Sequence, residues 1–276
     1  MTITQAPRIE HRHAAVMTAA ENDRFVELAR SLSPGDWSEP TDCPAWDVRA
    51  MAGHVLGMME FTCSVREFVH VLRAGGKAAG DRPAIDGMTE VQVAERAHLT
   101  CGELLDRLAG AAPRASRARR RLPAPLRRIP TPQEFDGAKE SWRLGYLFDV
   151  ILTRDTWMHR VDISRATGRE MVLTPEHDGR IVADVVEEWA RRHGRPYVLT
   201  LHGPAGGDFR GGDGGEEISS TPSSSAGSCP AAAPAPDCSA SRFPSDEPEP
   251  ESEPASEPEP ASEPDPEPAP GSVSTG

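Results

Sequence analysis

The stretch DVRAMAGHVLGMMEFTCSVREFVHVLRA, residues 47–74, decides the fold. Apolar side chains recur in it at steps of three and four residues, which is the spacing of one buried helical face. They are Val48, Met51, Val55, Met58, Val65, Val69 and Leu72, with Thr62 in the same register. Asp47 has the side chain of a helix N-cap, so we expect one helix over 47–74. A helix of that length with a single apolar stripe is typical of a helical bundle.

Further helices show the same spacing, between segments rich in Gly and Pro. We expect them at residues 10–32, 89–111 and 137–167, with a loop at 75–87 and a Pro- and Arg-rich connection at 112–135. A capping box of Thr89 and Gln92 would open the third helix, and Gly168 would end the fourth. A fifth helix would begin at Thr174 and Pro175 and end near Gly194. The alternation in PYVLTLHGPAGGDF predicts a strand and a turn.

The fold class that we expect is therefore mainly α. An antiparallel four-helix bundle would occupy residues 10–168, and residues 169–218 would add a helix and the start of a small C-terminal α/β lobe. The tail over 219–276 has 14 of the 27 prolines, and 11 acidic residues against one basic residue. Such a segment buries too little apolar surface to offset chain entropy, so we expect it to be disordered.

Charge and composition exclude several classes of function. The tail carries −10 of the total charge of −13, so the rest of the chain is nearly neutral and predicts no nucleic-acid partner. The sequence has no run of 18 apolar residues, which argues against a membrane span. The N-terminus MTITQAPRIEHRH lacks the apolar core of a secretory signal. Five scattered cysteines without a CxxC pair indicate reduced thiols and a cytoplasmic location.

Two polar residues stand on the apolar face of the fourth helix. Asp155 and His159 lie four residues apart, in register with Phe148, Leu152 and Ile163. A carboxylate buried on that face requires a partner. One interpretation is an Asp–His hydrogen bond that closes the core. The other is a pair of metal ligands, because side chains four residues apart on a helix converge on one point.

His54 would supply the third ligand. It flanks the apolar stripe of its helix, where a histidine can equally be a packed core residue. Two imidazoles, one carboxylate and one open position form a set typical of catalytic zinc. Asp162, one turn beyond His159, is either the acceptor for the outer imidazole N–H or the partner of Arg165 or Arg169 in a surface ion pair.

Seven arginines gather in RASRARRRLPAPLRR, residues 114–128, with no interleaved aromatic side chain. This run is either a solvated loop or a group that holds an anionic substrate or a thiol cofactor at the mouth of the bundle.

The segments TDCPAWDVRAMAGHVLG (41–57) and RDTWMHRVDISRATGR (154–169) together resemble the mycothiol-dependent maleylpyruvate isomerase family of actinobacteria. The resemblance extends over most of residues 10–218. It implies a DinB-like four-helix bundle that binds a divalent metal, with ligands at His54, Asp155 and His159. The family has Glu at the second of these positions, so the shorter Asp155 would hold the metal nearer its helix.

The resemblance also implies an enzyme that uses zinc and the thiol cofactor mycothiol on a small electrophilic substrate. Reversible thiol addition would isomerise a conjugated double bond, and lasting addition would be thiol transfer. The alternatives are a non-catalytic metal-binding protein and a metal-dependent hydrolase with a bound hydroxide. Four filled positions around the metal would favour the first alternative, and an open position would favour the enzyme.

The resemblance further separates the tail from the rest of the chain. Family members continue beyond GGDGGEEI, residues 211–218, into a sterol-carrier-like lobe, whereas this chain continues SSTPSSS. With GC-rich codons chosen for the tail, one added base lets it read ELDAVEFCRILS, with a stop codon further on. We therefore raise the hypothesis that residues 219–276 are a frameshift product. The lobe would then be incomplete and the strand near Tyr197–Leu201 would have an unpaired edge. The alternative is a genuine acidic, Pro-rich tail.

Overall fold

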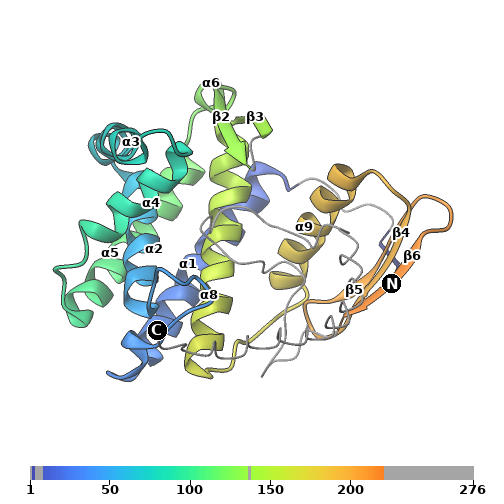
Figure 1. Cartoon of the computed structure of the whole chain (residues 1–276), viewed down its shortest axis with the longest axis horizontal. Coiled ribbons are helices and arrows are strands. Elements are labelled where there is room, and N and C mark those ends of the chain that lie inside the picture. Colours follow the sequence, from blue (N-terminus) through green and yellow to red (C-terminus); the bar gives the residue numbers. More distant parts are fainter. Residues whose placement is uncertain (1, 4–8, 136–137, 221–276) are drawn as a thin grey trace, which may run out of the picture. The chain divides into compact units, whose positions relative to one another are not determined.

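The computed structural model describes residues 2–3, 9–135 and 138–220, and most of this part is helical (Figure 1). Its helices are α1 (His11–Ser31), α2 (Val48–Cys63), α3 (Val65–Ala79), α4 (Ala84–Ala94), α5 (Cys101–Arg120), α6 (Ala124–Arg127), α7 (Leu144–Tyr146), α8 (Leu152–Thr167) and α9 (Asp178–His193). A 3-10 turn covers Asp36–Ser38, and a π-helix, Leu147–Ile151, leads directly into α8. Its strands are β1 (Thr2–Ile3), β2 (Pro130–Phe135), β3 (Ala138–Arg143), β4 (Tyr197–Leu201), β5 (Gly207–Gly211) and β6 (Glu216–Ser220).

Helices α1, α2, α5 and α8 form the bundle, because α5 and α8 each pack against both α1 and α2. Fully buried apolar side chains from three of these helices fill its core: Phe25, Met51, Leu56, Leu104 and Leu108. The mainly α bundle that the sequence predicted is confirmed. Asp47 is the expected N-cap of α2, since its carboxylate accepts the Ala50 N–H at 2.7 Å.

The single helix expected over 47–74 is wrong. The chain breaks at Ser64, whose hydroxyl accepts the Glu67 N–H at 3.2 Å and caps α3. The apolar spacing continues through this break, but Val65 is 82% exposed and Leu72 is 44% exposed. The second half of the stripe therefore does not face the bundle core.

The third helix was also placed wrongly. Thr89 lies inside α4, in a segment partly assigned to a loop, and its hydroxyl donates to the Asp86 carbonyl at 2.9 Å. The capping box belongs to Thr100 and Glu103, at the start of α5. From there α5 continues through Pro113 to Arg120, so much of the expected connection over 112–135 is helical.

The helix expected over 137–167 and the helix expected to begin at Thr174 also start at other residues than predicted. Residues 130–143 form the antiparallel hairpin β2–β3, so helical structure begins only at Leu144. Gly168 ends α8 with a φ of +65°, as expected. Thr174 does not cap α9 directly, because the helix begins at Asp178, whose carboxylate accepts the Thr174 N–H at 2.7 Å.

The C-terminal lobe is a sheet of order β1-β5-β4-β6 packed against α9. β4 pairs antiparallel with β5 and parallel with β6, so the expected strand is confirmed but its expected unpaired edge is wrong. β6 also crosses the predicted boundary at Ile218. The expectations of disorder and of a frameshift product otherwise concern residues 221–276, which lie outside the described residues. Within the described part, no helix is long and apolar enough to cross a membrane.

Candidate metal centre

Helix α8 is buried on nearly all sides although its sequence is polar. Between Leu152 and Ile163, every buried side chain except Trp157 is polar: Thr153, Arg154, Asp155, Thr156, His159 and Arg160. A buried polar group must find a partner on a neighbouring element. These residues divide among three faces of α8, which meet α9, α1 and α2 in turn.

The face toward α2 brings together the three predicted ligands. His54 on α2 and His159 on α8 each place Nε2 3.5 Å from the same carboxylate oxygen, Asp155 Oδ2. The three ligand atoms lie within 4.8 Å of one another. All three residues are buried, with relative exposures of 2%, 7% and 1% for His54, Asp155 and His159. We call this group the triad.

The triad brings three unused hydrogen-bonding atoms to one point between α2 and α8, whereas the other such atoms of α8, Arg154 Nε and Ser164 Oγ, belong to no such group. His54 Nε2, Asp155 Oδ2 and His159 Nε2 are all buried, and none has a hydrogen-bond partner among the described residues. Buried acceptors in this state are rare in folded proteins and indicate a missing partner. The simpler interpretation, an Asp–His hydrogen bond that closes the core, leaves these three atoms unexplained.

The electrostatics of the triad favour the interpretation as a metal site. Burial alone would raise the pKa of Asp155, but the His159 and His54 imidazoles outweigh it and hold that pKa below its ordinary value. Burial also disfavours a charged imidazole at His159, yet the Asp155 carboxylate raises the pKa of His159 to about 10. Burial lowers the pKa of His54. The Asp155 carboxylate therefore stays ionised in the interior, and a protonated imidazole balances its charge. A bound metal cation could supply that positive charge in place of the proton.

Distances within the triad fit a divalent metal. Zinc bonds to imidazole nitrogen and carboxylate oxygen are about 2.0–2.2 Å, so two ligands of a tetrahedral ion are separated by about 3.4 Å. Both nitrogen-to-oxygen separations in the triad are 3.5 Å. The Asp155 side chain, although shorter than that of glutamate, therefore reaches far enough to share one metal ion with both imidazoles. Within the described part of the chain, no fourth His, Cys, Asp or Glu completes the group.

Two neighbours shape the surroundings of the triad. Trp46 lies at the entrance to α2 and is half-buried, with its ring centroid 5.0 Å from that of His54 and 6.0 Å from that of His159. Asp162 Oδ2 lies 3.4 Å from His159 Nδ1, on the far side of the ring from Asp155. The alternative partners of Asp162 are engaged elsewhere, since Arg165 pairs with Asp42 and Arg169 with Asp36, both at 2.7 Å.

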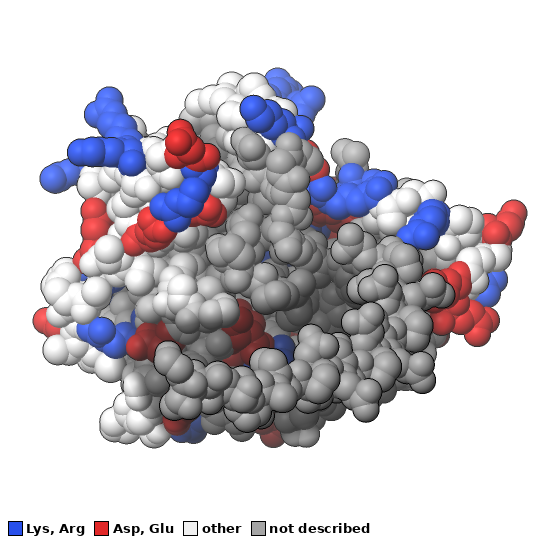
Figure 2. Space-filling model, in the orientation of Figure 1, with Lys and Arg blue, Asp and Glu red and all other residues white. Residues whose placement is uncertain are grey.

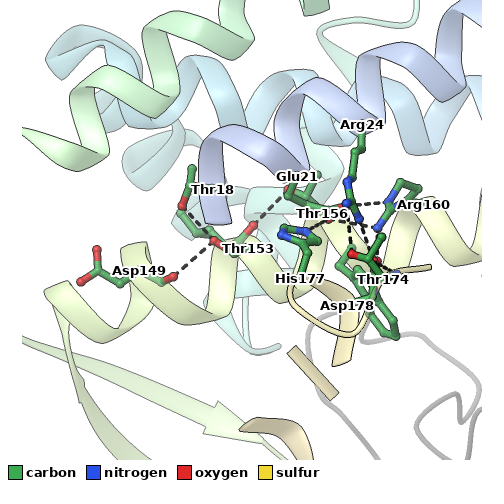
Figure 3. Close-up of polar contacts among 12 residues, drawn as sticks. Thr18, Glu21, Arg24, Asp149, Thr153, Thr156, Arg160, Thr174, His177 and Asp178 are labelled. Atoms are coloured by element: carbon green, nitrogen blue, oxygen red, sulfur yellow. Dashed lines mark hydrogen bonds and ion pairs between the residues drawn. The ribbon is translucent and has the colours of Figure 1, made fainter. Parts of the chain in front are cut away.

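A second cluster, Glu21–His177–Asp178, was not foreseen from the sequence. It lies on the α1 face of α8 and its geometry also resembles a ligand set (Figure 3). Here, however, Arg160 donates to Glu21 at 2.8 Å and to Asp178 at 2.5 Å, and His177 contacts Glu21 at 2.6 Å. Arg24 donates to the other Asp178 oxygen at 2.6 Å. Because these carboxylates already have cationic partners, we interpret this cluster as a buried ion-pair network that joins α1, α8 and α9.

The face toward α9 is likewise filled by ion pairs. Arg154 pairs with Glu188 and with Asp184, and the Tyr146 hydroxyl donates to Glu188 at 2.7 Å. These residues border a cavity of about 1180 Å³ that is also lined by Trp142. No member of the triad lines it, so the cavity and the triad are separate features.

The arginine run proves to be divided. Most of its side chains are exposed: Arg114, Arg117, Arg120, Arg121 and Arg128. Arg127 is half-buried and pairs with Asp149, and Arg119 is buried in the bundle. On the face drawn in Figure 2, basic and acidic side chains are interspersed near α3 and α6. The sequence could not show which arginine turned inward, because that depends on the register of α5.

Comparison with known proteins relates this arrangement to one family. The family model described as "Mycothiol maleylpyruvate isomerase N-terminal domain" matches residues 18–164, just over half of the chain, and this range contains the whole triad. The "Crystal structure of the mycothiol-dependent maleylpyruvate isomerase" has the same fold, with a TM-score of 0.51 and 14% identity, covering 79% of this chain and 88% of that chain. A structure of a mutant of that isomerase gives a TM-score of 0.49 and 13% identity, with the same coverage. No curated protein matches the sequence.

Proposed function

Because this chain belongs to the family of the mycothiol maleylpyruvate isomerase N-terminal domain, we propose that it is a metal-dependent enzyme that uses mycothiol on a small electrophilic substrate. His54, Asp155 and His159 would hold the metal, with zinc as the ion that suits two imidazoles and a carboxylate. The observation that carries this proposal is the convergence of three buried ligand atoms without hydrogen-bond partners.

The chain's own residues prepare the triad for this role. Asp162 Oδ2 lies 3.4 Å from His159 Nδ1, so Nδ1–H would donate to Asp162 and leave Nε2, which faces Asp155, as the nitrogen for the metal. The Trp46 ring lies beside the two imidazoles, with its centroid 5.0 Å from that of His54 and 6.0 Å from that of His159. The metal, when bound, favours the deprotonated form of a coordinating thiol.

The number of ligands favours an enzyme over a purely structural metal site. Structural zinc sites are closed by four protein ligands, and catalytic sites keep one position open. The described part of the chain supplies three ligands. Isomerisation of a conjugated double bond and thiol transfer both fit such a site, since they differ only in whether thiol addition is reversed.

The proposal also divides the chain by role. Residues 10–168 would form the metal-binding bundle, and residues 169–220, through the end of β6, the small lobe. The residues after Ser220 would be a tail without a part in the chemistry.

Cobalt substitution tests this function directly. The cobalt-loaded protein should take up one equivalent of Co²⁺ with a tetrahedral visible spectrum, and mycothiol should add a thiolate-to-cobalt charge-transfer band in the near ultraviolet. An S-methylated mycothiol should add no such band. Failure to bind cobalt would refute the metal centre. A cobalt spectrum that mycothiol leaves unchanged would refute thiol chemistry and favour a metal-binding or hydrolytic role.

A further inference from the structure

Gln92 is a buried polar residue of α4, the helix that packs against α2. The capping box that its spacing suggested lies elsewhere, so its side chain needs another explanation. Its relative exposure is 3%, and its Oε1 is buried without a hydrogen-bond partner among the described residues. Burying a carboxamide oxygen without a hydrogen bond costs stability, so we expect a donor next to it.

The close approach of α4 to α2 places Gln92 beside His54. The two helices lie side by side (Figure 1). A Cβ atom at Gly57 of α2 would lie 2.7 Å from both Cβ and Cγ of Gln92, so only glycine leaves room for this contact. His54 is three residues before Gly57 and therefore lies on the same side of α2. Burial lowers the pKa of His54, the Asp155 carboxylate opposes this effect, and a side-chain hydrogen bond with Gln92 opposes it further.

His54 has the matching unused atom. Its Nε2 lies 3.5 Å from Asp155 Oδ2, whereas its other ring nitrogen, Nδ1, is buried and has no hydrogen bond of normal geometry. Within the described residues of α2 and α4, the two His54 nitrogens and Gln92 Oε1 are the only buried side-chain atoms in this state. An imidazole that binds a metal through one nitrogen carries a proton on the other, and a carboxamide oxygen can accept a hydrogen bond from it.

We propose that Gln92 is the positioning residue of His54: its carboxamide oxygen accepts the Nδ1–H and leaves Nε2 as the nitrogen turned toward Asp155. This inference rests on the proposed function and deepens it, because it names the residue that orients one ligand. Gln92 itself contacts neither the metal nor the thiol. Its relation to His54 parallels that of Asp162 to His159, with a neutral carboxamide in place of a carboxylate.

The zinc affinity of the full chain, measured by competition with a chromophoric chelator, tests this positioning role. Gln92→Leu keeps a side chain of similar size without the acceptor, so its Kd for zinc should rise about 10–100-fold. Gln92→Glu should bind zinc at least as tightly as wild type, because a carboxylate is the stronger acceptor. Glu90→Gln, on the exposed side of α4, is the control and should keep the wild-type Kd. A Kd of Gln92→Leu within twofold of wild type overturns the inference.

Cobalt spectra separate a positioning residue from a fourth ligand. With saturating Co²⁺ in place of zinc, wild type and Gln92→Leu should have the same visible bands, because the ligands of the metal are unchanged. Bands that shift in the variant would show that Gln92 binds the metal directly, and the inference would then be wrong.

A double-mutant cycle on the metal-free protein tests the contact independently of the proposed function. In the wild-type background, Gln92→Leu leaves Nδ1 of His54 unpaired, whereas in His54→Leu that partner is already absent. The fall in Tm caused by Gln92→Leu should therefore be at least about 2 °C larger in the wild-type background. Additive changes in Tm overturn the contact. A wild type that binds no zinc refutes the proposed function, and the cycle still decides whether Gln92 and His54 are paired.

Discussion

Replacing His159 with alanine should abolish the stabilisation of the protein by zinc. A ligand that binds only the folded state stabilises it by about 2.7 kcal/mol at 100 times its Kd. For a folded body of about 200 residues, each kcal/mol corresponds to about 2–4 °C in Tm. Zinc at that concentration should therefore raise the wild-type Tm by about 5–11 °C. In His159→Ala the shift should be lost, because only His54 and Asp155 of the buried triad remain.

The assay is differential scanning fluorimetry of the metal-free protein with and without zinc, beside metal analysis after dialysis. Comparing each variant with itself removes the effect of the substitution on the metal-free fold. His70→Ala is the matched control, since His70 is exposed on α3 and pairs with Glu95 at 2.6 Å. His177→Ala tests the second cluster. Both should retain the zinc shift. One equivalent of zinc in dialysed His159→Ala, or a full Tm shift, would refute the assignment of the ligands.

Three further predictions concern other parts of the molecule. The pKa of Glu188 is held at about 2, against an ordinary 4.5, chiefly because Arg154 outweighs burial, so its contribution of about 3 kcal/mol should be complete above pH 4.5 and lost as pH falls toward 2. Urea unfolding of Glu188→Gln should show a flatter stability profile over that range, and an unchanged profile would contradict the ion pair. Ser64→Ala should lower the free energy of unfolding by about 1 kcal/mol, and Ser64→Asp should preserve it, since only the latter keeps the cap. Sequencing the gene across the Ile218 codon should show downstream codons that read ELDAVEFCRILS in a shifted frame, and codons incompatible with that frame exclude the frameshift.

The part of the candidate site that lies within one helix could be predicted from the sequence. Asp155 and His159 are four residues apart on one helix, so their convergence follows from helical geometry alone. His54 required the bundle as a further assumption, because its helix had to face theirs. The sequence left open whether Asp162 meets His159 or pairs with Arg165 or Arg169. Only the structure shows its carboxylate 3.4 Å from His159 Nδ1 and both arginines engaged elsewhere.

The remaining polar core could not be predicted because its partners are distant in sequence. Glu21 and Arg160 are 139 residues apart, and nothing in the local pattern around Glu21 marks it as buried. Arg119 looks like any other member of a basic run. Only the register of α5, which begins at the Thr100 capping box, turns it inward.

The predicted helix boundaries were wrong in two situations. In one the apolar spacing continues across a break between two helices, and in the other a proline lies inside a helix without ending it. The apolar spacing around Ser64 continues from α2 into α3, although the two helices face different surroundings. Pro113 suggested an end, but it lies inside α5. The hairpin at 130–143 contains Pro130 and Pro132, which weaken any strand signal, since proline occupies strands mainly at edges and ends.

The π-helix at Leu147–Ile151 makes the chain tolerant of a change in length just ahead of the candidate metal centre. An α-helix advances by about 100° per residue, and a π-turn accommodates one residue more than an α-turn. Removing one residue from this segment would convert it into ordinary α-helix and leave the direction of Asp155 and His159 relative to α7 nearly unchanged, because the wider turn already absorbs the extra residue. Removing one residue of ordinary α-helix between Leu152 and Asp155 would instead rotate both side chains by about 100°. Two single-codon deletions a few positions apart would thus differ in effect, since the first would keep the three candidate ligands together and the second would separate them while every one remained encoded.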